Sequence, residues 1–380
     1  MVEERDFAGI GIPFAAGIAA GIISSETLTP SLAHCLAALS CTAAAAMAVA
    51  MTAAPGKERI EAPLRILASF TFLACGFFCA LNSRIMQGIG TELDGGIGSA
   101  ARRACAILKE TIDAIPYSKE GTGALVKALL TGDRSGLDRE TTACFRAAGA
   151  SHILALSGLH LGLLHLILTK LTAPLGNSRK ARVARYSLTV GFAGFYCLMT
   201  GAGPSIVRAF LFILLSQTAT LLGREKPPVL ILLGALTIQL AIKPDVATTL
   251  GFQLSYLAMV GIFTLYPALE GIYPQPEREL WRKMDPFRKI WNGAMLSLSC
   301  QVFTAPLVWF KFQTFPKFFL ITNMTALPLT SAIMAVSAAT IALSALGICP
   351  VSLVHLDETL VQTLISVLKT VAELDSSSWT

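Results

Sequence analysis

Charged residues are scarce in this sequence. Only 14% of its 380 residues are charged, whereas 54% are hydrophobic, and the mean hydropathy is +0.63. A soluble globular chain carries roughly a quarter charged residues, because its surface has to be polar. The composition therefore excludes a soluble globular protein and predicts that much of the surface faces lipid. The net charge of +6 is modest and does not by itself indicate a nucleic-acid partner.

Patterns that bind metals or cofactors are also missing. The chain has only five histidines, and none of them has the spacing of a zinc motif. Cys75 and Cys79 lie one helical turn apart, but no histidine or second cysteine pair is close enough in sequence to complete a site. We interpret the cysteines within hydrophobic stretches as small packing residues. We expect no metal and no cofactor.

Long hydrophobic stretches are abundant. Stretches of roughly 17 to 25 residues are typical of membrane-spanning helices. They predict an all-α, polytopic integral membrane protein with about ten transmembrane helices and a short helical extramembrane insert. The predicted spans are 7–23, 31–54, 64–83, 150–170, 184–200, 205–222, 228–243, 247–267, 291–310 and 318–346.

Three segments need a specific interpretation: the first predicted span, the last one and the segment that follows it. The first span is kept as a helix rather than a signal peptide, because Glu3, Glu4 and Asp6 replace the basic leader that such a peptide needs. Pro328 predicts a kink or a break in 318–346. The segment 352–374 is amphipathic, and we expect it to lie at the membrane interface.

Lysine and arginine in the short loops predict the orientation, with the N-terminus in the bacterial cytoplasm. Fourteen such residues then fall in cytoplasmic loops and three in the opposite short loops. The cytoplasmic set is Lys57, Arg59, Lys170, Arg179, Lys180, Arg182, Arg185, Arg224, Lys226, Arg278, Arg282, Lys283, Arg288 and Lys289, and the opposite set is Lys243, Lys311 and Lys317.

The chain divides into four segments on this basis. Residues 1–83 form an N-terminal region of three spans, 84–149 an extracytoplasmic helical insert, 150–346 a membrane channel domain, and 347–380 an amphipathic helix and tail. The insert holds Cys105 and Cys144, and a disulfide between them is predicted to stabilise it.

Residues 129–164, LLTGDRSGLDRETTACFRAAGASHILALSGLHLGLL, are the most informative stretch. A turn around Asp133 and Arg134 leads to a short helix and then to a span that contains His152, Ser157 and His160. Polar groups are costly in lipid and usually face a protein interior or a water-filled path. At helical spacing these three residues are predicted to share one face.

This stretch resembles the signature of the ComEC competence family, in GDRSGL and FRAAGASHILALSGLHLGLL. Three later segments fit the same pattern: GPSIVRAF at 203–210, PDVATTLGFQLSYLAMVGI at 244–262 and QVFTAPLVWFKFQTFPKFFLITNMTALPL at 301–329. The resemblance covers residues 120–345 and implies a polytopic channel that passes one DNA strand into the cytoplasm. It also implies partners, namely a DNA receptor and a cytoplasmic helicase. The oligomeric state is left open.

The chain differs from the family in two respects. Members typically carry an oligonucleotide-binding β-barrel, and 84–118 is too short and too helical for one. Many also carry a metallo-β-lactamase-like domain with a His-x-His-x-Asp-His motif, which no spacing here reproduces. The sequence is thus expected to be a minimal form.

The channel hypothesis singles out residues that would line a DNA path: His152, Ser157, His160, Arg208, Gln253 and Ser255. Asp133 and Arg134 are candidates for the entry loop, pairing with each other or with the insert. Arg208 could instead extend to the outer interface, and Gln253 and Ser255 could serve helix packing. Two other functions stay open: a transporter of another solute on this scaffold, and an intramembrane serine hydrolase using Ser157 and His160.

Overall fold

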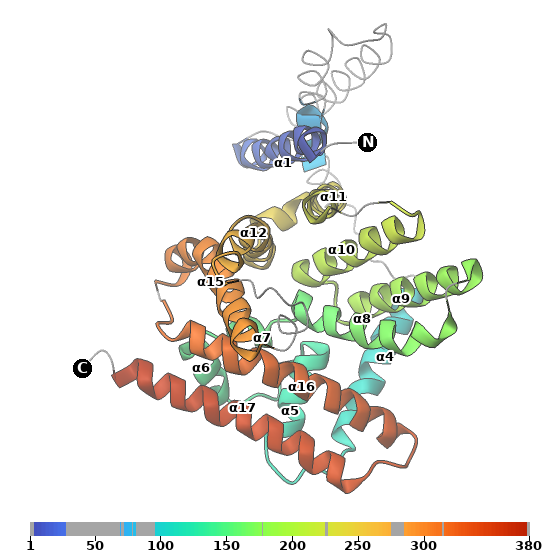
Figure 1. Ribbon diagram of the computed structural model, residues 1–380, viewed down its shortest axis with the longest axis vertical. Coiled ribbons are helices and arrows are strands. Elements are labelled where there is room, and N and C mark those ends of the chain that lie inside the picture. Colours follow the sequence, from blue (N-terminus) through green and yellow to red (C-terminus); the bar gives the residue numbers. More distant parts are fainter. Residues whose placement is uncertain are drawn as a thin grey trace, which may run out of the picture. The chain divides into compact units, whose positions relative to one another are not determined.

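The computed structural model describes residues 4–27, 69, 72–77, 79–80, 96–176, 178–224, 227–274, 285–313 and 315–377. Every regular element within these ranges is a helix (Figure 1). The predicted all-α class is therefore confirmed for the described part of the chain. The span at 31–54, most of the span at 64–83, the loop charges Lys57, Arg59, Lys226, Arg278, Arg282 and Lys283, and the glycine-rich opening of the insert lie outside these residues.

The helices, in chain order and with the labels of Figure 1, are α1 (Glu4–Thr27), α4 (Gly96–Asp113), α5 (Thr122–Thr131), α6 (Arg139–Ala147), α7 (Ser151–Leu154), α8 (Gly158–Thr172), η1 (Ala173–Leu175), α9 (Arg179–Met199), α10 (Pro204–Leu221), α11 (Pro228–Ile242), η2 (Pro244–Thr248), α12 (Leu250–Thr264), α13 (Tyr266–Glu270), α15 (Pro286–Phe312), α16 (Phe319–Ala345) and α17 (Val351–Ser377).

Five helical segments of the described chain are long and apolar enough to cross a membrane: Gly158–Leu175, Pro204–Leu221, Pro286–Phe312, Phe319–Ala345 and Val351–Leu374. Shorter apolar helices occur at Ile12–Ile23, Thr122–Thr131, Pro228–Ile242 and Leu250–Thr264. Together they are the architecture of a polytopic membrane protein. The prediction that one helix runs from 150 to 170 is wrong, because the chain leaves the helical conformation between Leu154 and Gly158.

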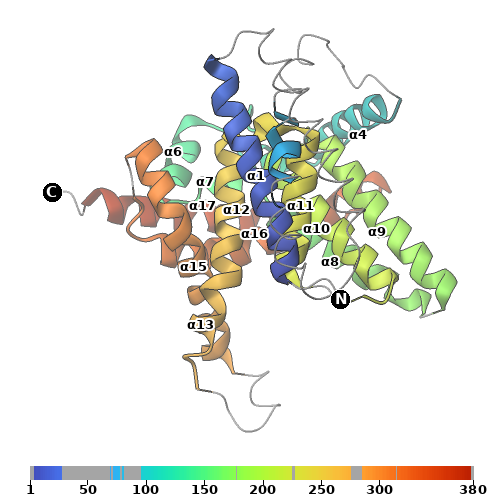
Figure 2. The ribbon, with the colours of Figure 1, turned by 90° about the horizontal axis from the view of Figure 1, so that it is seen from above.

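The chain forms two compact units, and neither is one continuous stretch. The first gathers the described residues within 1–94, 177–190 and 210–253. Within it, α1 lies beside α11 (Figure 2). Gly17 of α1 also lies against the backbone carbonyl of Leu73, and Gly76 against that of Phe14. A side chain at either glycine would collide with backbone, so these glycines are what allow the two helical segments to approach so closely.

The second unit gathers 95–176, 191–209 and 254–380, and its core lies between α5, α6, α7, α16 and α17. The last two helices are connected by a short turn at Gly347, whose φ is +71°, and run antiparallel side by side (Figure 1). Residues at helical spacing on α17 face this core, and all are at most 5% exposed: Val361, Leu364, Leu368 and Val371.

The polar face expected for 352–374 is not wholly exposed. Asp357 has 0% exposure and Glu358 has 5%. The Asp357 carboxylate accepts hydrogen bonds from Ser337 Oγ (2.8 Å) and from Tyr117 Oη (2.8 Å). The Glu358 carboxylate accepts from the backbone N–H groups of Ser118 and Lys119. We call this arrangement the carboxylate clasp. It attaches α17 to the turn between α4 and α5.

Candidate functional site at the start of α8

The interruption between α7 and α8 places Ser157 at the N-cap of α8. Ser157 has extended backbone angles, and its Oγ accepts a hydrogen bond of 3.2 Å from the backbone N–H of Leu159. The His160 ring reaches back, so that its Nδ1 lies 3.2 Å from the Ser157 backbone N and 2.9 Å from Ser157 Oγ. This reciprocal pattern is a capping box, with histidine in the place usually taken by glutamate or glutamine.

The capping box fixes which nitrogen of His160 carries the proton. A backbone N–H group can only donate, so Nδ1 is the acceptor, and a neutral ring then holds its proton on Nε2. The ring has 0% exposure, and Nε2 is buried without a hydrogen-bond partner among the described residues. His160 therefore presents an unused donor within the protein.

Arg208 lies next to this helix start. It belongs to the second turn of α10, and it is only 8% exposed. A methyl group added to Gly158 would lie 2.9 Å from Arg208 Nη2 and 3.5 Å from the Ala209 Cβ atom. The guanidinium thus packs against the first residue of α8, which explains the glycine at this position. The alternative that Arg208 extends to the membrane surface does not agree with its burial.

No carboxylate among the described residues pairs with Arg208. Its Nε is buried without a hydrogen bond, and its electrostatic neighbours are the Tyr256 hydroxyl group and the Cys300 thiol group. A buried charge without a partner costs several kcal/mol and is usually found where a ligand or a path requires it. Arg208, His160 and the start of α8 are the main features of the candidate site.

The entry-loop candidates pair with neighbouring elements of the insert and of α7. Asp133 Oδ2 lies 2.6 Å from Lys109 Nζ of α4, and its Oδ1 accepts from Ser135. The hydrogen bond from Lys109, supported by those from Ser135, holds the pKa of Asp133 well below its usual range. Arg134 Nε donates to the backbone carbonyl of Leu154 at 3.0 Å, at the end of α7.

Two glycines of the signature stretch occupy positions that only glycine fits. Gly132 ends α5 with φ of +79°, and a Cβ atom there would lie 2.5 Å from Leu156 Cδ1. Gly149 has φ of +75°, and a Cβ atom there would lie 2.6 Å from the Pro316 Cβ atom. A positive φ disfavours residues with a side chain. These two glycines of the signature are therefore required by packing, Gly132 against Leu156 and Gly149 against Pro316, which precedes α16.

Of the remaining path candidates, His152 is an electrostatic neighbour of His160 across the interruption, whereas Gln253 and Ser255 lie on α12. His152 is exposed on α7, with Nδ1 3.1 Å from the Gly149 carbonyl. The prediction that it shares one helix face with Ser157 and His160 is wrong, because the interruption after Leu154 separates them. Gln253 and Ser255 are half-buried on α12. The Gln253 amide donates to the Ala247 carbonyl at 2.9 Å, within the first unit.

The predicted disulfide is not formed. Cys105 in α4 and Cys144 in α6 are both free thiols. Their neighbourhoods differ, because Cys105 lies near Lys109 and Tyr196, whereas Cys144 lies near Lys369 and Glu140. In the part of the chain that the structure describes, no group of three or more histidine, cysteine or acidic residues is placed to hold a metal ion.

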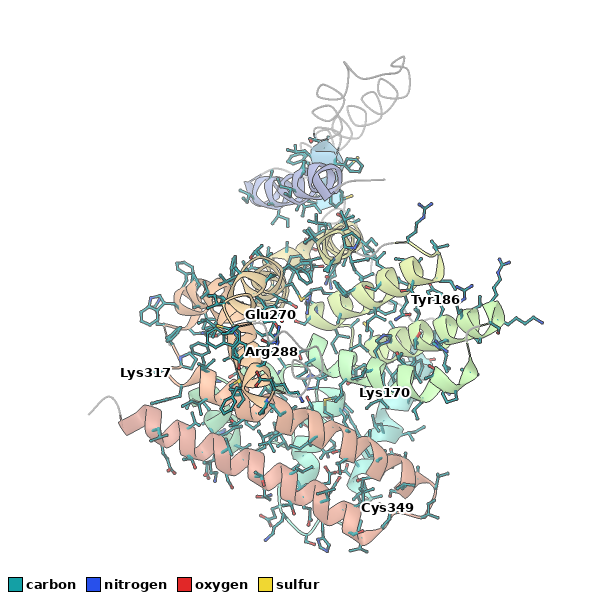
Figure 3. All side chains as sticks on the ribbon, viewed as in Figure 1. Lys170, Tyr186, Glu270, Arg288, Lys317 and Cys349 are labelled. Atoms are coloured by element: carbon teal, nitrogen blue, oxygen red, sulfur yellow. The ribbon has the colours of Figure 1, made fainter. Side chains whose placement is uncertain are left out.

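Several polar residues that sequence reasoning overlooked become buried contacts. Tyr196 Oη donates to the Leu130 carbonyl at 2.7 Å and connects α9 to α5. Arg288, counted among the cytoplasmic loop charges, is only 6% exposed, and its Nη2 lies 3.8 Å from Glu270 Oε1 (Figure 3). Asn323 of α16 donates to Ser297 of α15 at 2.7 Å. An asparagine inside an apolar stretch was the only signal for such a contact.

These features define a helical membrane protein with a buried, cationic polar site. The model of the Competence protein family matches residues 129–380, which include all four sequence motifs. ComE operon protein 3 of Bacillus subtilis (strain 168) is 28% identical over 211 residues, which make up 55% of this chain and 25% of that protein. No solved structure matches the chain. The chain belongs to the Competence protein family, and it spans about a quarter of the length of this relative.

Proposed function

We propose that this chain forms the membrane part of a channel that passes single-stranded DNA across the bacterial cytoplasmic membrane during natural transformation. The observation that carries the proposal is the family match over 129–380, because this segment contains the buried cation Arg208 and the capped start of α8. A DNA strand crossing a membrane needs cationic groups that meet its phosphates away from bulk water.

The site residues take different parts in this proposal. Arg208 supplies charge, while Ser157 and His160 shape the helix start beside it. Asp133 and Arg134 hold the turn that precedes α6, through Lys109 and the Leu154 carbonyl. His152, Gln253 and Ser255 remain candidates for the path. The proposal extends to a DNA receptor outside and a helicase inside, to contact with membrane lipid, and to an N-terminus in the cytoplasm.

The basic residues between the last turn of α8 and the first turns of α9 suit the inner end of such a path. Lys170, Arg179, Lys180, Arg182 and Arg185 lie within one short stretch, and α9 begins in its middle. The positive-inside rule accounts for their side of the membrane without any ligand. Their contribution to DNA binding would appear as a salt-dependent loss of affinity when several are neutralised together.

Hydrolysis is the less favoured function, although Ser157 Oγ lies 2.9 Å from His160 Nδ1. The hydroxyl oxygen also accepts from Leu159 N–H, which is its ordinary task at an N-cap. A nucleophile and base are normally completed by a third group that orients the base. Nε2 of His160 has no such partner among the described residues.

The test is transformation in a deletion strain of the native organism, complemented with the wild-type chain at its normal membrane level. Restoration of transformants and of DNase-resistant uptake of labelled DNA is expected. A deletion strain that transforms as well as its parent would overturn the channel. Should the deletion instead abolish growth on one particular solute, the transporter alternative would take its place.

A further inference from the structure

The groups that meet at the start of α8 are all hydrogen-bond donors. Arg208 offers N–H groups and no acceptor. The N–H groups in the first turn of a helix have no intrahelical carbonyl to bind. Ser157 Oγ caps those of Leu159 and His160, which leaves the N–H of Gly158, the residue that touches Arg208 Nη2. His160 adds a third donor, since its Nδ1 is occupied as an acceptor and Nε2 carries the proton. Such a set matches an anion with several oxygen atoms.

The electrostatics of the site point the same way. The start of a helix carries a partial positive charge, and here a guanidinium packs directly against it. The two positive groups repel each other, so this arrangement is favourable only with negative charge beside them. Tyr256 and Cys300 are the ionisable neighbours of Arg208. A phenol and a thiol are ordinarily uncharged at neutral pH, and they supply no counter-charge.

The burial of the donors separates this site from an ordinary helix start. Arg208 is 8% exposed with its Nε unpartnered, and His160 is 0% exposed with its Nε2 unpartnered. α8 is 15 residues long, so its dipole is developed. Two buried donors are thus left without partners near the start of α8, one on Arg208, which packs against Gly158, and one on the His160 ring, which packs against Ser157.

We propose that Arg208, His160 and the first turn of α8 form a binding site for one phosphate oxyanion. Its occupant is a phosphate ester, either of a DNA strand or of an anionic lipid headgroup. The assignment to DNA rests on the proposed function, whereas the oxyanion site rests on the donors alone. Arg208 would hold two oxygen atoms with its planar fork, and the helix start a third.

The probe is a fluorescently labelled thymidine octanucleotide, added to the full chain in nanodiscs of zwitterionic phosphatidylcholine. Fluorescence anisotropy gives its affinity for the wild type and for Arg208→Gln, Arg208→Lys and Gly158→Ala. The matched control is Arg146→Gln, because Arg146 is an exposed arginine on α6. An octanucleotide with a neutral methylphosphonate backbone tests the requirement for charge without any variant, so that a poorly folding mutant does not decide the result.

We expect Arg208→Gln to weaken octanucleotide binding by about tenfold or more, as the loss of a charge-assisted hydrogen bond predicts. The affinity of Arg208→Lys should lie between those of the wild type and Arg208→Gln, because lysine keeps the charge but lacks the planar guanidinium group. Gly158→Ala should also weaken binding, since its methyl group displaces the guanidinium. Arg146→Gln should bind within about twofold of the wild type, and the methylphosphonate probe should bind poorly to every form.

Nanodiscs with phosphatidylglycerol distinguish the two sources of the ester. Competition by this lipid that requires Arg208 would identify a headgroup as the occupant and would support the site while removing its assignment to DNA. Equal binding of the octanucleotide by wild type and Arg208→Gln, with no effect of phosphatidylglycerol, would overturn the site. Neither result depends on transformation, so a failure of the channel proposal in the deletion strain is a separate outcome.

Discussion

The hydroxyl group of Tyr117 donates a hydrogen bond of 2.8 Å to Oδ2 of Asp357, and 240 positions separate the two residues in the chain. Ser337 donates to the same carboxylate, and the adjacent Glu358 accepts from the backbone of Ser118 and Lys119. Burial and the nearby Asp357 carboxylate raise the pKa of the Tyr117 hydroxyl, so it remains a donor at neutral pH. The carboxylate clasp is therefore a fixed part of the second unit.

Removing one donor should destabilise this unit. Tyr117→Phe leaves the buried Asp357 carboxylate with Ser337 as its remaining donor, and we expect a loss of about 1–3 kcal/mol of unfolding free energy. The control is Tyr273→Phe, because its partner Asp285 also accepts from the N–H groups of Phe287 and Arg288. Thermal unfolding in detergent measures both variants. Equal melting temperatures for the two would contradict a structural role for the clasp.

Gly149 should tolerate alanine less well than a glycine with the same backbone and open surroundings. Gly149→Ala combines a positive φ with a collision against Pro316, whereas Gly121 has φ of +79° and nothing within 4 Å of its added Cβ atom. The positive φ costs about 1–2 kcal/mol in both variants, and overpacking adds about 1–3 kcal/mol at Gly149 only. Membrane-expressed yield and melting temperature would show the difference, and a Gly121→Ala variant as unstable as Gly149→Ala would exclude this explanation.

The Lys109–Asp133 pair predicts a pH dependence. The pKa of Asp133 is lowered in the folded chain, so its contribution is fully present above the unfolded value of about 4 and is lost as the pH falls through the folded value. Both side chains are about a third exposed, at 34% and 27%. Solvent screening then limits the contribution to about 0.5–1 kcal/mol.

Unfolding of wild type and Asp133→Asn, compared between pH 3 and pH 8, tests this. The wild type should be more stable by a constant amount above about pH 5, and the two curves should converge in acid. A difference that grows as the pH falls would have the wrong sign for this pair.

Substitutions of Ser157 should separate helix capping from nucleophilic chemistry. Asparagine caps a helix about as well as serine but has no hydroxyl group, whereas alanine loses the cap at a cost of about 1 kcal/mol. We expect Ser157→Asn to transform nearly as well as the wild type, Ser157→Ala to show a mild defect, and Arg208→Ala to be severely defective at matched protein levels. A loss of function by orders of magnitude in both Ser157 variants, with near-normal Arg208→Ala, would favour an enzyme.

Three exposed glycines with open space around them can report the topology. Gly121, Gly176 and Gly347 all have positive φ and no heavy atom within 4 Å of an added Cβ atom. Each is replaced by cysteine in a cysteine-free background, and intact spheroplasts are treated with an impermeant thiol reagent. We expect Gly121→Cys to react and Gly176→Cys to be protected until lysis. We also expect Gly347→Cys to react, because the nearby Ser344 lines a cavity with Ile115 of the insert, whereas the ten predicted spans would place residue 347 in the cytoplasm. Reaction of Gly176→Cys with Gly121→Cys protected would reverse the orientation.

The helical architecture and the family were accessible from the sequence, because apolar length and the four motifs depend on local residue order. The match over 129–380 confirms the resemblance that those motifs indicated. Helix starts such as that of α10 at Pro204 are also encoded locally, since proline fits the first helical turn.

The arrangement of the candidate site was harder to predict from the sequence. Hydropathy runs continuously through Leu154 and Gly158, so it did not reveal that Ser157 caps a new helix. The burial of Asp357 and Arg288 depends on partners between 18 and 240 residues away, and Arg208 packs against Gly158 of another helix. Charge counting assigned Arg288 to a loop and Asp357 to a polar helix face, because a single sequence contains no record of such long-range pairs.

The carboxylate clasp constrains the number of times that the chain can cross the membrane between Ser118 and Glu358. A chain that returns to the side it left has crossed an even number of times, and Ser118 is a hydrogen-bonded neighbour of Glu358. The hydrophobic stretches predicted between them number seven, which is odd. Both ends of α16 lie beside the insert, since Pro316 meets Gly149, and Ser344 lines a cavity with Ile115. We therefore predict that α16 begins and ends on one face of the bilayer and adds no crossing, although 318–346 is among the ten spans predicted from the sequence and is long enough to cross. Reaction of Gly347→Cys with the impermeant reagent tests this prediction.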